Sequence, residues 1–217
     1  MLDLDGVREY SYTLDRTFLE PSCGNGNFLV EILARKLSCL DAISVENKSL
    51  WEMSMLQAVS TIYGVDIQND NVEESRERML TIILKKYADS HSGESMSNDL
   101  LRSVKVILLN NIVCGDFLTE KFVSDINDNN AGNLDSGEKR TLENVHHMNG
   151  DVLEVYEWNF DFKRETICTK TYTLESIVKS KNNGIDSDSQ REYSTVLYSK
   201  LYNAEEKAAK TYDDLGI

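Results

Sequence analysis

The stretch that decides the fold of this chain is Phe18-Leu19-Glu20-Pro21-Ser22-Cys23-Gly24-Asn25-Gly26-Asn27-Phe28-Leu29. A short apolar run, Thr17 to Glu20, enters a turn of small residues, and apolar side chains recur at helical spacing from Asn27 onward. Gly24 and Gly26 have no side chain that would keep a ligand from the backbone, and the amide protons of the following helix point into the turn. Pro21 is the only proline, and its fixed φ is also typical of a purely structural turn. The stretch predicts a strand, a glycine loop and a helix, which is where a nucleotide-like cofactor lies in a doubly wound sheet.

Strands and helices continue to alternate along the first half of the chain. Helical periodicity recurs at 47–59, 69–87 and 99–109, and β-branched runs at 61–66 and 112–115, the latter ending at Asp116, predict strands. Asn69 or Asp70 can cap the helix at 69–87 through a side-chain oxygen. Three strands that alternate with helices imply crossover connections, and hence a mostly parallel sheet with helices on both faces.

The second half of the chain has a different pattern. Residues 123–150 are rich in Asn, Asp, Gly and Ser, which predicts a long loop or a disordered segment. Two β-rich runs, 152–160 and 165–174, flank a polar turn and predict an antiparallel hairpin over 151–174. Residues 180–190 are linker-like, and 192–212 predict a terminal helix. We therefore expect one α/β domain over residues 1–217, with its core at 17–118 and the hairpin as an extension.

The acidity of the chain limits its partners. The 217 residues carry a formal net charge of −14, and residues 120–161 alone hold ten acidic and three basic residues. Because nucleic-acid affinity comes mainly from cations that displace counterions, the overall field cannot hold a phosphate backbone. Lys163, Arg164 and Lys170 form a basic cluster near the hairpin, but a solvated turn is the favoured interpretation. Any DNA contact therefore requires a local patch or a partner subunit.

Neither a membrane nor a metal ion is expected as a partner. No segment approaches the ~20 apolar residues that span a bilayer, and the acidic start, Met1 to Asp5, is unlike a signal peptide, so we expect a cytoplasmic location. The four cysteines form no Cys-x-x-Cys pair, which predicts buried or bystander thiols. A metal role for His146 and His147 is disfavoured against a solvated loop, because adjacent side chains diverge and no third ligand is apparent.

Glu20, Pro21, Gly24, Gly26 and Phe28 fill every defined position of the pattern Asp/Glu-Pro-x-x-Gly-x-Gly-x-Phe. The stretch thus resembles motif I of the S-adenosylmethionine-dependent DNA methyltransferases that modify the adenine amino group. This resemblance implies a Rossmann-like methyltransferase fold and S-adenosyl-L-methionine as cofactor. Glu20 would accept hydrogen bonds from the cofactor's ammonium group, while the loop, which includes Cys23 and Asn25, would let the methionine tail approach.

Two further matches follow in the order of that family. Tyr63-Gly64-Val65-Asp66-Ile67 resembles the second motif, which implies that Asp66 binds the ribose hydroxyls and that Ile67 packs against the adenine. Cys114-Gly115-Asp116-Phe117 resembles the third, which implies that Asp116 accepts from the adenine amine and that Phe117 lies on the ring. Taken singly, either aspartate is more typical of a helix cap or turn. In this order, and together with Glu20 and the glycines, they favour the cofactor site.

The chain departs from the family where the catalytic motif should follow. The family places Asn/Asp-Pro-Pro-Tyr/Phe there to accept from the target amine and to stack on a flipped base. This chain has no second proline, and Asn159-Phe160-Asp161-Phe162, which keeps only the first and last residue types, falls at the expected hairpin turn. The family's target-recognition region also has no counterpart. No catalytic residue is therefore assigned.

Three hypotheses about function remain open. The resemblance covers about residues 17–118, and the hairpin and terminal helix are similar to those of small restriction-modification methylase subunits. The first hypothesis is a DNA methyltransferase-like protein of restriction-modification type that transfers a methyl group to an adenine amine if it is active. The second is an inactive cofactor-binding module or accessory subunit that acts through a partner protein. The third is methyl transfer to a protein or small molecule.

Overall fold

The computed structural model describes residues 7–123, 141–144, 147, 149–174, 176 and 190–207. The helices are α1 (Val7–Ser11), α2 (Asn27–Ser38), α3 (Lys48–Ser60), α4 (Asn69–Ser90) and α5 (Asn98–Asn111), with 3-10 turns η1 (Cys39–Ala42) and η2 (Tyr198–Asn203). The strands are β1 (Phe18–Glu20), β2 (Ile62–Asp66), β3 (Ile112–Asp116), β4 (Lys121–Phe122), β5 (Glu154–Asp161), β6 (Thr166–Thr173), β7 (Arg191–Glu192) and β8 (Val196–Leu197). Among the described helices, none combines the length and apolar character needed to cross a membrane.

The first sheet has the order β1-β2-β3-β4, with β1, β2 and β3 parallel and β4 antiparallel to β3. The predicted alternation of strands and helices in this half of the chain is confirmed. Asn47 caps α3 and Ser97 caps α5, because each side chain accepts a hydrogen bond from the amide three residues later. Capping of α4 by Asn69 or Asp70 is wrong: Gln68 occupies the N-cap without a side-chain bond, and Asp70 lies in the first turn, where its charge favours the helix dipole.

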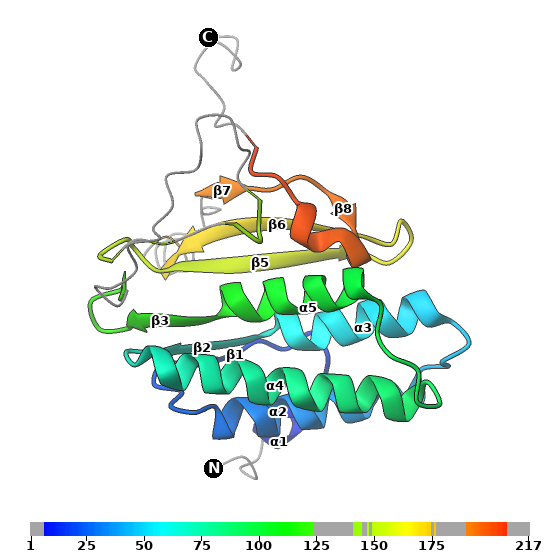
Figure 1. The fold of residues 1–217 in the computed structure, drawn as a ribbon. Helices are drawn as coiled ribbons and strands as arrows, with labels where there is room; N and C mark the ends of the chain where they lie inside the picture. Colours follow the sequence, from blue (N-terminus) through cyan, green and yellow to red (C-terminus); the bar gives the residue numbers. More distant parts are fainter. Residues whose placement is uncertain are drawn as a thin grey trace, which may run out of the picture.

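Figure 1 shows three layers: α2 and α4 along one side, β1–β3 with α3 and α5 in the middle, and the β5–β6 pair on the other side. The outer layer of helices forms because α2 and α4 bury apolar stripes with helical spacing. These stripes are Leu29, Ile32, Leu33 and Leu37 on α2, and Val72, Met79, Ile83 and Tyr87 on α4.

Helices are expected on both faces of the sheet, but in the part of the chain that the structure describes they cover only one face. Because α3 ends one residue before β2 and α5 runs directly into β3, these helices extend the layer of the strands rather than stack on it. The hairpin covers the other face instead: Leu153 packs with Val65 and Val113, and Trp158 Nε1 donates to Asn111 Oδ1 at 2.9 Å. In the described residues the sheet therefore has helices on one face and a second sheet on the other.

The predicted hairpin is confirmed, since β5 and β6 pair antiparallel from Glu154 with Thr173 to Asp161 with Thr166. The predicted terminal helix at 192–212 is wrong over its described part. There β7 and β8 pair with β6, η2 follows, and Tyr193 bridges to Glu206. The remainder, 208–212, lies outside the described residues. So do the linker at 180–189 and most of the predicted loop at 123–150, although Leu142 is fully buried within it.

Candidate functional site

The residues singled out from the sequence meet where three parallel strands end. β1, β2 and β3 are parallel, with Glu20 in register with Gly64 and Asp66 in register with Cys114. Glu20, Asp66 and Asp116 are the last residues of these strands, so they lie at the same end of the sheet. We call residues 20–27, 66–68 and 116–118 the carboxyl edge. In open α/β sheets, ligands bind outside the carboxyl ends of the strands, at the point where the strand order reverses. In the described residues the order β1-β2-β3 does not reverse, so the carboxyl ends are present without such a point.

The two glycines of the turn have different constraints. Both have positive φ, +51° at Gly24 and +80° at Gly26, a region that side chains rarely adopt. A Cβ added to Gly26 would lie 2.8 Å from Ser75 Oγ on α4, whereas a Cβ added to Gly24 would meet nothing within 4 Å. Gly26 is therefore required by packing against α4, and the space over Gly24 is open.

Asp66 fixes this turn from the neighbouring strand. Its Oδ2 accepts from the Gly24 amide at 2.8 Å, and its Oδ1 accepts from the Gln68 amide at 3.0 Å and from Asn71 Nδ2 at 3.1 Å. Burial acts to raise the pKa of this carboxyl, but the hydrogen bonds from Gln68, Asn71 and Gly24 outweigh it, so the pKa lies below its ordinary value. A carboxylate offers about four acceptor positions, so one is left unused, on a side chain that is 8% exposed.

Side chains of α4 hold the turn from the other side. Ser75 Oγ donates to the Gly24 carbonyl at 2.9 Å, and Arg78 donates to the Asn25 carbonyl and to Asn27 Oδ1. Sequence reasoning missed these residues. The available signal was Ser75 itself, a polar residue within the buried stripe of α4, between Val72 and Met79.

Two of the predicted loop residues, Cys23 and Phe28, pack into the protein, and a third, Pro21, is exposed. Cys23 is buried, its amide donates to the Val65 carbonyl, and burial together with the charge of Asp66 raises the pKa of its thiol to about 11. Phe28 is partly buried against the main core, and Pro21 is exposed in the turn. Because of its raised pKa, the Cys23 thiol stays protonated at neutral pH and does not act as a nucleophile.

Glu20, Ile67 and Asp116 remain accessible at the carboxyl edge. Glu20 is half-buried and accepts from the Ser22 amide at 3.4 Å. Ile67 is 59% exposed, a large apolar side chain beside Asp66. Asp116 is half-buried, and hydrogen bonds from the Thr119 side chain and the Leu118 amide lower the pKa of its carboxyl, so it is ionised at neutral pH.

Phe117 differs from the other predicted residues at this edge. It packs against the small cluster of Val65, Val113, Phe122 and Leu153 on the hairpin side of the sheet. Its aromatic ring therefore contributes to the contact between the two sheets.

Asn159–Phe162, which keeps two residue types of the family's catalytic motif, lies at the turn between β5 and β6. Asp161 Oδ1 accepts from the amides of Lys163 and Arg164, both at 3.0 Å, which is the geometry of a turn. Val152, two residues before β5, bridges to Lys121 of β4. From there β5 extends from Glu154 to Asp161, about 24 Å at the rise of a strand. Figure 1 places this turn at the far end from the tip of β3. Asn159–Phe162 therefore lies away from the carboxyl edge.

The basic cluster at the hairpin is paired with acids. Arg164 contacts Asp161 at 3.0 Å, and Lys170 contacts Glu192 at 3.2 Å. The four cysteines are free, and the described residues contain no group of three or more His, Cys, Asp or Glu side chains that could hold a metal ion. His147 stacks on Phe122, and His146 lies outside the described residues.

Comparison of the chain with protein-family models, with curated proteins and with solved structures found no match.

Proposed function

We propose that this chain binds S-adenosylmethionine at the carboxyl edge and transfers the methyl group to an adenine amino group in DNA. One observation carries the proposal. Three separate stretches of sequence end at the carboxyl edge, in the order of the three motifs of the resemblance. They supply Glu20 with the glycine turn, Asp66, and Asp116. A Rossmann-like methyltransferase fold is part of the same proposal.

The accessible side chains at this edge fit the chemistry of the cofactor. Glu20 and Asp116 offer carboxylates to an ammonium group and to an adenine amine, and Ile67 offers an apolar surface to the ring. Asp66 is 8% exposed and holds the turn in place through three hydrogen bonds, and its remaining acceptor position would serve a ribose hydroxyl. The cofactor supplies an electrophilic methyl group on a sulfonium. The role of the protein is then to hold that methyl in line with the target amine.

Calorimetric titration with S-adenosylmethionine tests this proposal directly. We expect the parent chain to bind, and Asp66→Ala and Gly26→Val each to weaken binding at least tenfold, which corresponds to ~1.4 kcal/mol. Gly93→Ala is the matched control, because Gly93 also has positive φ, +85°, but is surrounded by open space and lies outside the carboxyl edge. The absence of binding by the folded parent chain would refute the cofactor assignment.

A second candidate function is an inactive cofactor-binding module or accessory subunit that acts through a restriction-modification partner. It is favoured by the position of Asn159–Phe162 at the far end of the hairpin and by the pairing of the basic cluster with acids. Incubation with labelled cofactor and varied DNA separates the two functions. Transfer of label to DNA by the chain alone supports the enzyme, and transfer that requires a partner supports the subunit. Transfer to protein or small molecules in a lysate would point to a different substrate.

A further inference from the structure

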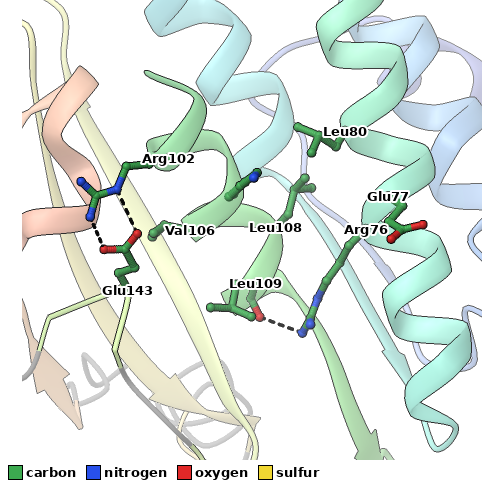
Figure 2. A pocket seen from close by; sticks show the side chains of 9 residues that line it. Arg76, Glu77, Leu80, Arg102, Val106, Leu108, Leu109 and Glu143 are labelled. Carbon is green, nitrogen blue, oxygen red and sulfur yellow. Dashed lines mark hydrogen bonds and ion pairs between the residues drawn. The ribbon is translucent and has the colours of Figure 1, made fainter. Parts of the chain in front are cut away.

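A groove lies between α4 and α5, and none of its lining residues belongs to the carboxyl edge (Figure 2). Its volume is about 240 Å³, and Leu80 from α4 with Val106 and Leu109 from α5 form its apolar floor. Leu109 is 39% exposed although it is a large aliphatic residue on a well-packed helix. The groove thus leaves apolar surface uncovered between two neighbouring helices.

Arg76 is fixed at one end of this groove. Its Nε donates to the Ile112 carbonyl at 2.8 Å and its Nη2 donates to the Leu109 carbonyl at 3.1 Å, at the end of α5 where backbone carbonyls lack helical partners. Figure 2 shows the side chain reaching from α4 to α5 in this way. Both acceptors are neutral, and among the described residues nothing accepts from Nη1. The guanidinium is therefore fixed by Nε and Nη2, and its Nη1 group remains as a donor.

The side chains that line the groove include three basic residues, Arg76, Arg102 and Lys105, and two acidic residues, Glu77 and Glu143. Arg102 is neutralised by Glu143, with Nε at 3.1 Å from Oε1 and Nη2 bonded to Oε2. The lining then holds Arg76 and Lys105 against Glu77, and Glu73 of α4 is also close enough to act on the Arg76 guanidinium. Within the described part of the chain Lys105 forms no salt bridge, so it is the basic side chain of the groove that is free to meet an acid. The lining therefore carries a small excess of positive charge, three basic against two acidic side chains, on a chain whose net charge is −14.

We propose that the α4–α5 groove is a docking site for an amphipathic helix of a partner protein, apolar on one face and acidic on its flanks. A helix fits between two neighbouring helices at ~8–10 Å from each axis, and its apolar face would cover Leu109 and the partly exposed Leu80. Its acidic flanks would meet Arg76 and Lys105, where the guanidinium can bind a carboxylate without first losing side-chain freedom. A second copy of this chain is a poorer occupant, because two chains of net charge −14 repel each other.

Fluorescence anisotropy with two labelled helical peptides of about 18 residues tests the proposal. Both peptides carry leucines at helical spacing on one face, and their flanks carry glutamates in one and lysines in the other. We expect the acidic peptide to bind the full chain at least tenfold more tightly at low ionic strength. Because the overall charge of the chain favours the basic peptide, equal binding or the reverse order would overturn the proposal.

Matched variants locate the binding site. We expect Lys105→Glu and Leu109→Ala each to weaken binding of the acidic peptide at least fivefold. Lys85→Glu and Leu84→Ala, at exposed positions of α4 that do not line the groove, are expected to leave it unchanged. Equal effects in both pairs of variants would place the peptide elsewhere and contradict the assignment. Sedimentation would reveal a second copy as the occupant if the parent chain dimerises and Leu109→Ala is a monomer.

Discussion

The two flanks of β1 are held by charged side chains of opposite sign. Before the strand, Lys36 of α2 donates to the carbonyls of Thr13 and Arg16, both at 2.7 Å. After the strand, Asp66 of β2 accepts from the amide of Gly24 at 2.8 Å. Because β1 has only three residues, these contacts do much to fix where the strand begins and ends.

The flanks differ in what they leave accessible. Lys36 is 0% exposed, and burial lowers the pKa of its ammonium to about 8 against the opposing charge of Asp15. At Asp66 the space over Gly24 is open and Ile67 is exposed. Similar anchoring thus produces a closed support before the strand and an edge that can meet a ligand after it. Substitutions on each side can separate these two roles.

The largest effect is expected at the glycine turn. Gly26→Ala combines left-handed strain with a Cβ 2.8 Å from Ser75 Oγ, and we expect the free energy of unfolding to fall by about 3 kcal/mol. Gly24→Ala adds strain alone, because its Cβ would meet nothing within 4 Å, and should cost about 1 kcal/mol. Urea denaturation of both variants measures the difference. Equal losses would show that packing against Ser75 does not constrain Gly26.

A smaller effect is expected at the closed flank. Lys36→Met keeps the length of the side chain but leaves the carbonyls of Thr13 and Arg16 without their donor, while removal of a buried charge returns part of that loss. We expect a net decrease of about 2 kcal/mol in the free energy of unfolding. Cofactor affinity should be unchanged, because Lys36 supports only the near end of β1. Lys85→Met, at an exposed position of α4, is the control, and a loss of cofactor affinity in Lys36→Met with its fold intact would contradict the division of roles.

The positions of the strand ends were predictable because the patterns behind them are local. Helical and strand periodicities within about ten residues identify each segment, and the rule that parallel strands end together then brings Glu20, Asp66 and Asp116 to one edge. The contacts of Ser75 and Arg78 with the loop were not predictable in this way. They join residues about fifty positions apart, and they depend on how α4 is rotated against the turn.

The second sheet shows why the helix predicted at 192–212 does not form over its described part. Residues 204–210 are Ala, Glu and Lys, which favour helix by intrinsic propensity and lie within the helix predicted at 192–212. In the described part of this segment, hydrogen bonds to β6 determine the structure, and the chain forms strands β7 and β8. The Tyr193 amide donates to the Thr169 carbonyl at 2.9 Å, and Tyr193 itself is fully buried. A partner strand more than twenty residues away therefore outweighs local propensity.

The open flank should also respond to pH. We expect Asp66→Asn to lower the free energy of unfolding by about 1.5 kcal/mol at pH 7, because the amide replaces a charged acceptor of three hydrogen bonds. The folded pKa of Asp66 lies below its ordinary value of 3.8, so its stabilisation is complete above that value and is lost as pH falls through the folded pKa. Denaturation at pH 7 and at pH 3 or below should therefore show the gap between parent and variant narrowing. Asp89→Asn, at an exposed position of α4 away from its first turn, is the control, and a gap independent of pH would exclude the charge of Asp66 as its source.

The smallest change in stability, and the sharpest test of accessibility, is expected at Ile67. Its side chain is 59% exposed, so Ile67→Ala should alter the free energy of unfolding by less than about 0.5 kcal/mol. If the adenine of the cofactor packs on this side chain, the same variant should weaken binding about three- to tenfold, since an apolar contact of this size contributes ~1 kcal/mol. Leu118→Ala, 94% exposed at the same edge, removes a comparable side chain beyond the strand end and controls for general loss of apolar surface. Calorimetry on both variants decides the matter: a loss confined to Ile67 places the ring beside Asp66, and equal losses or none would move it away from β2.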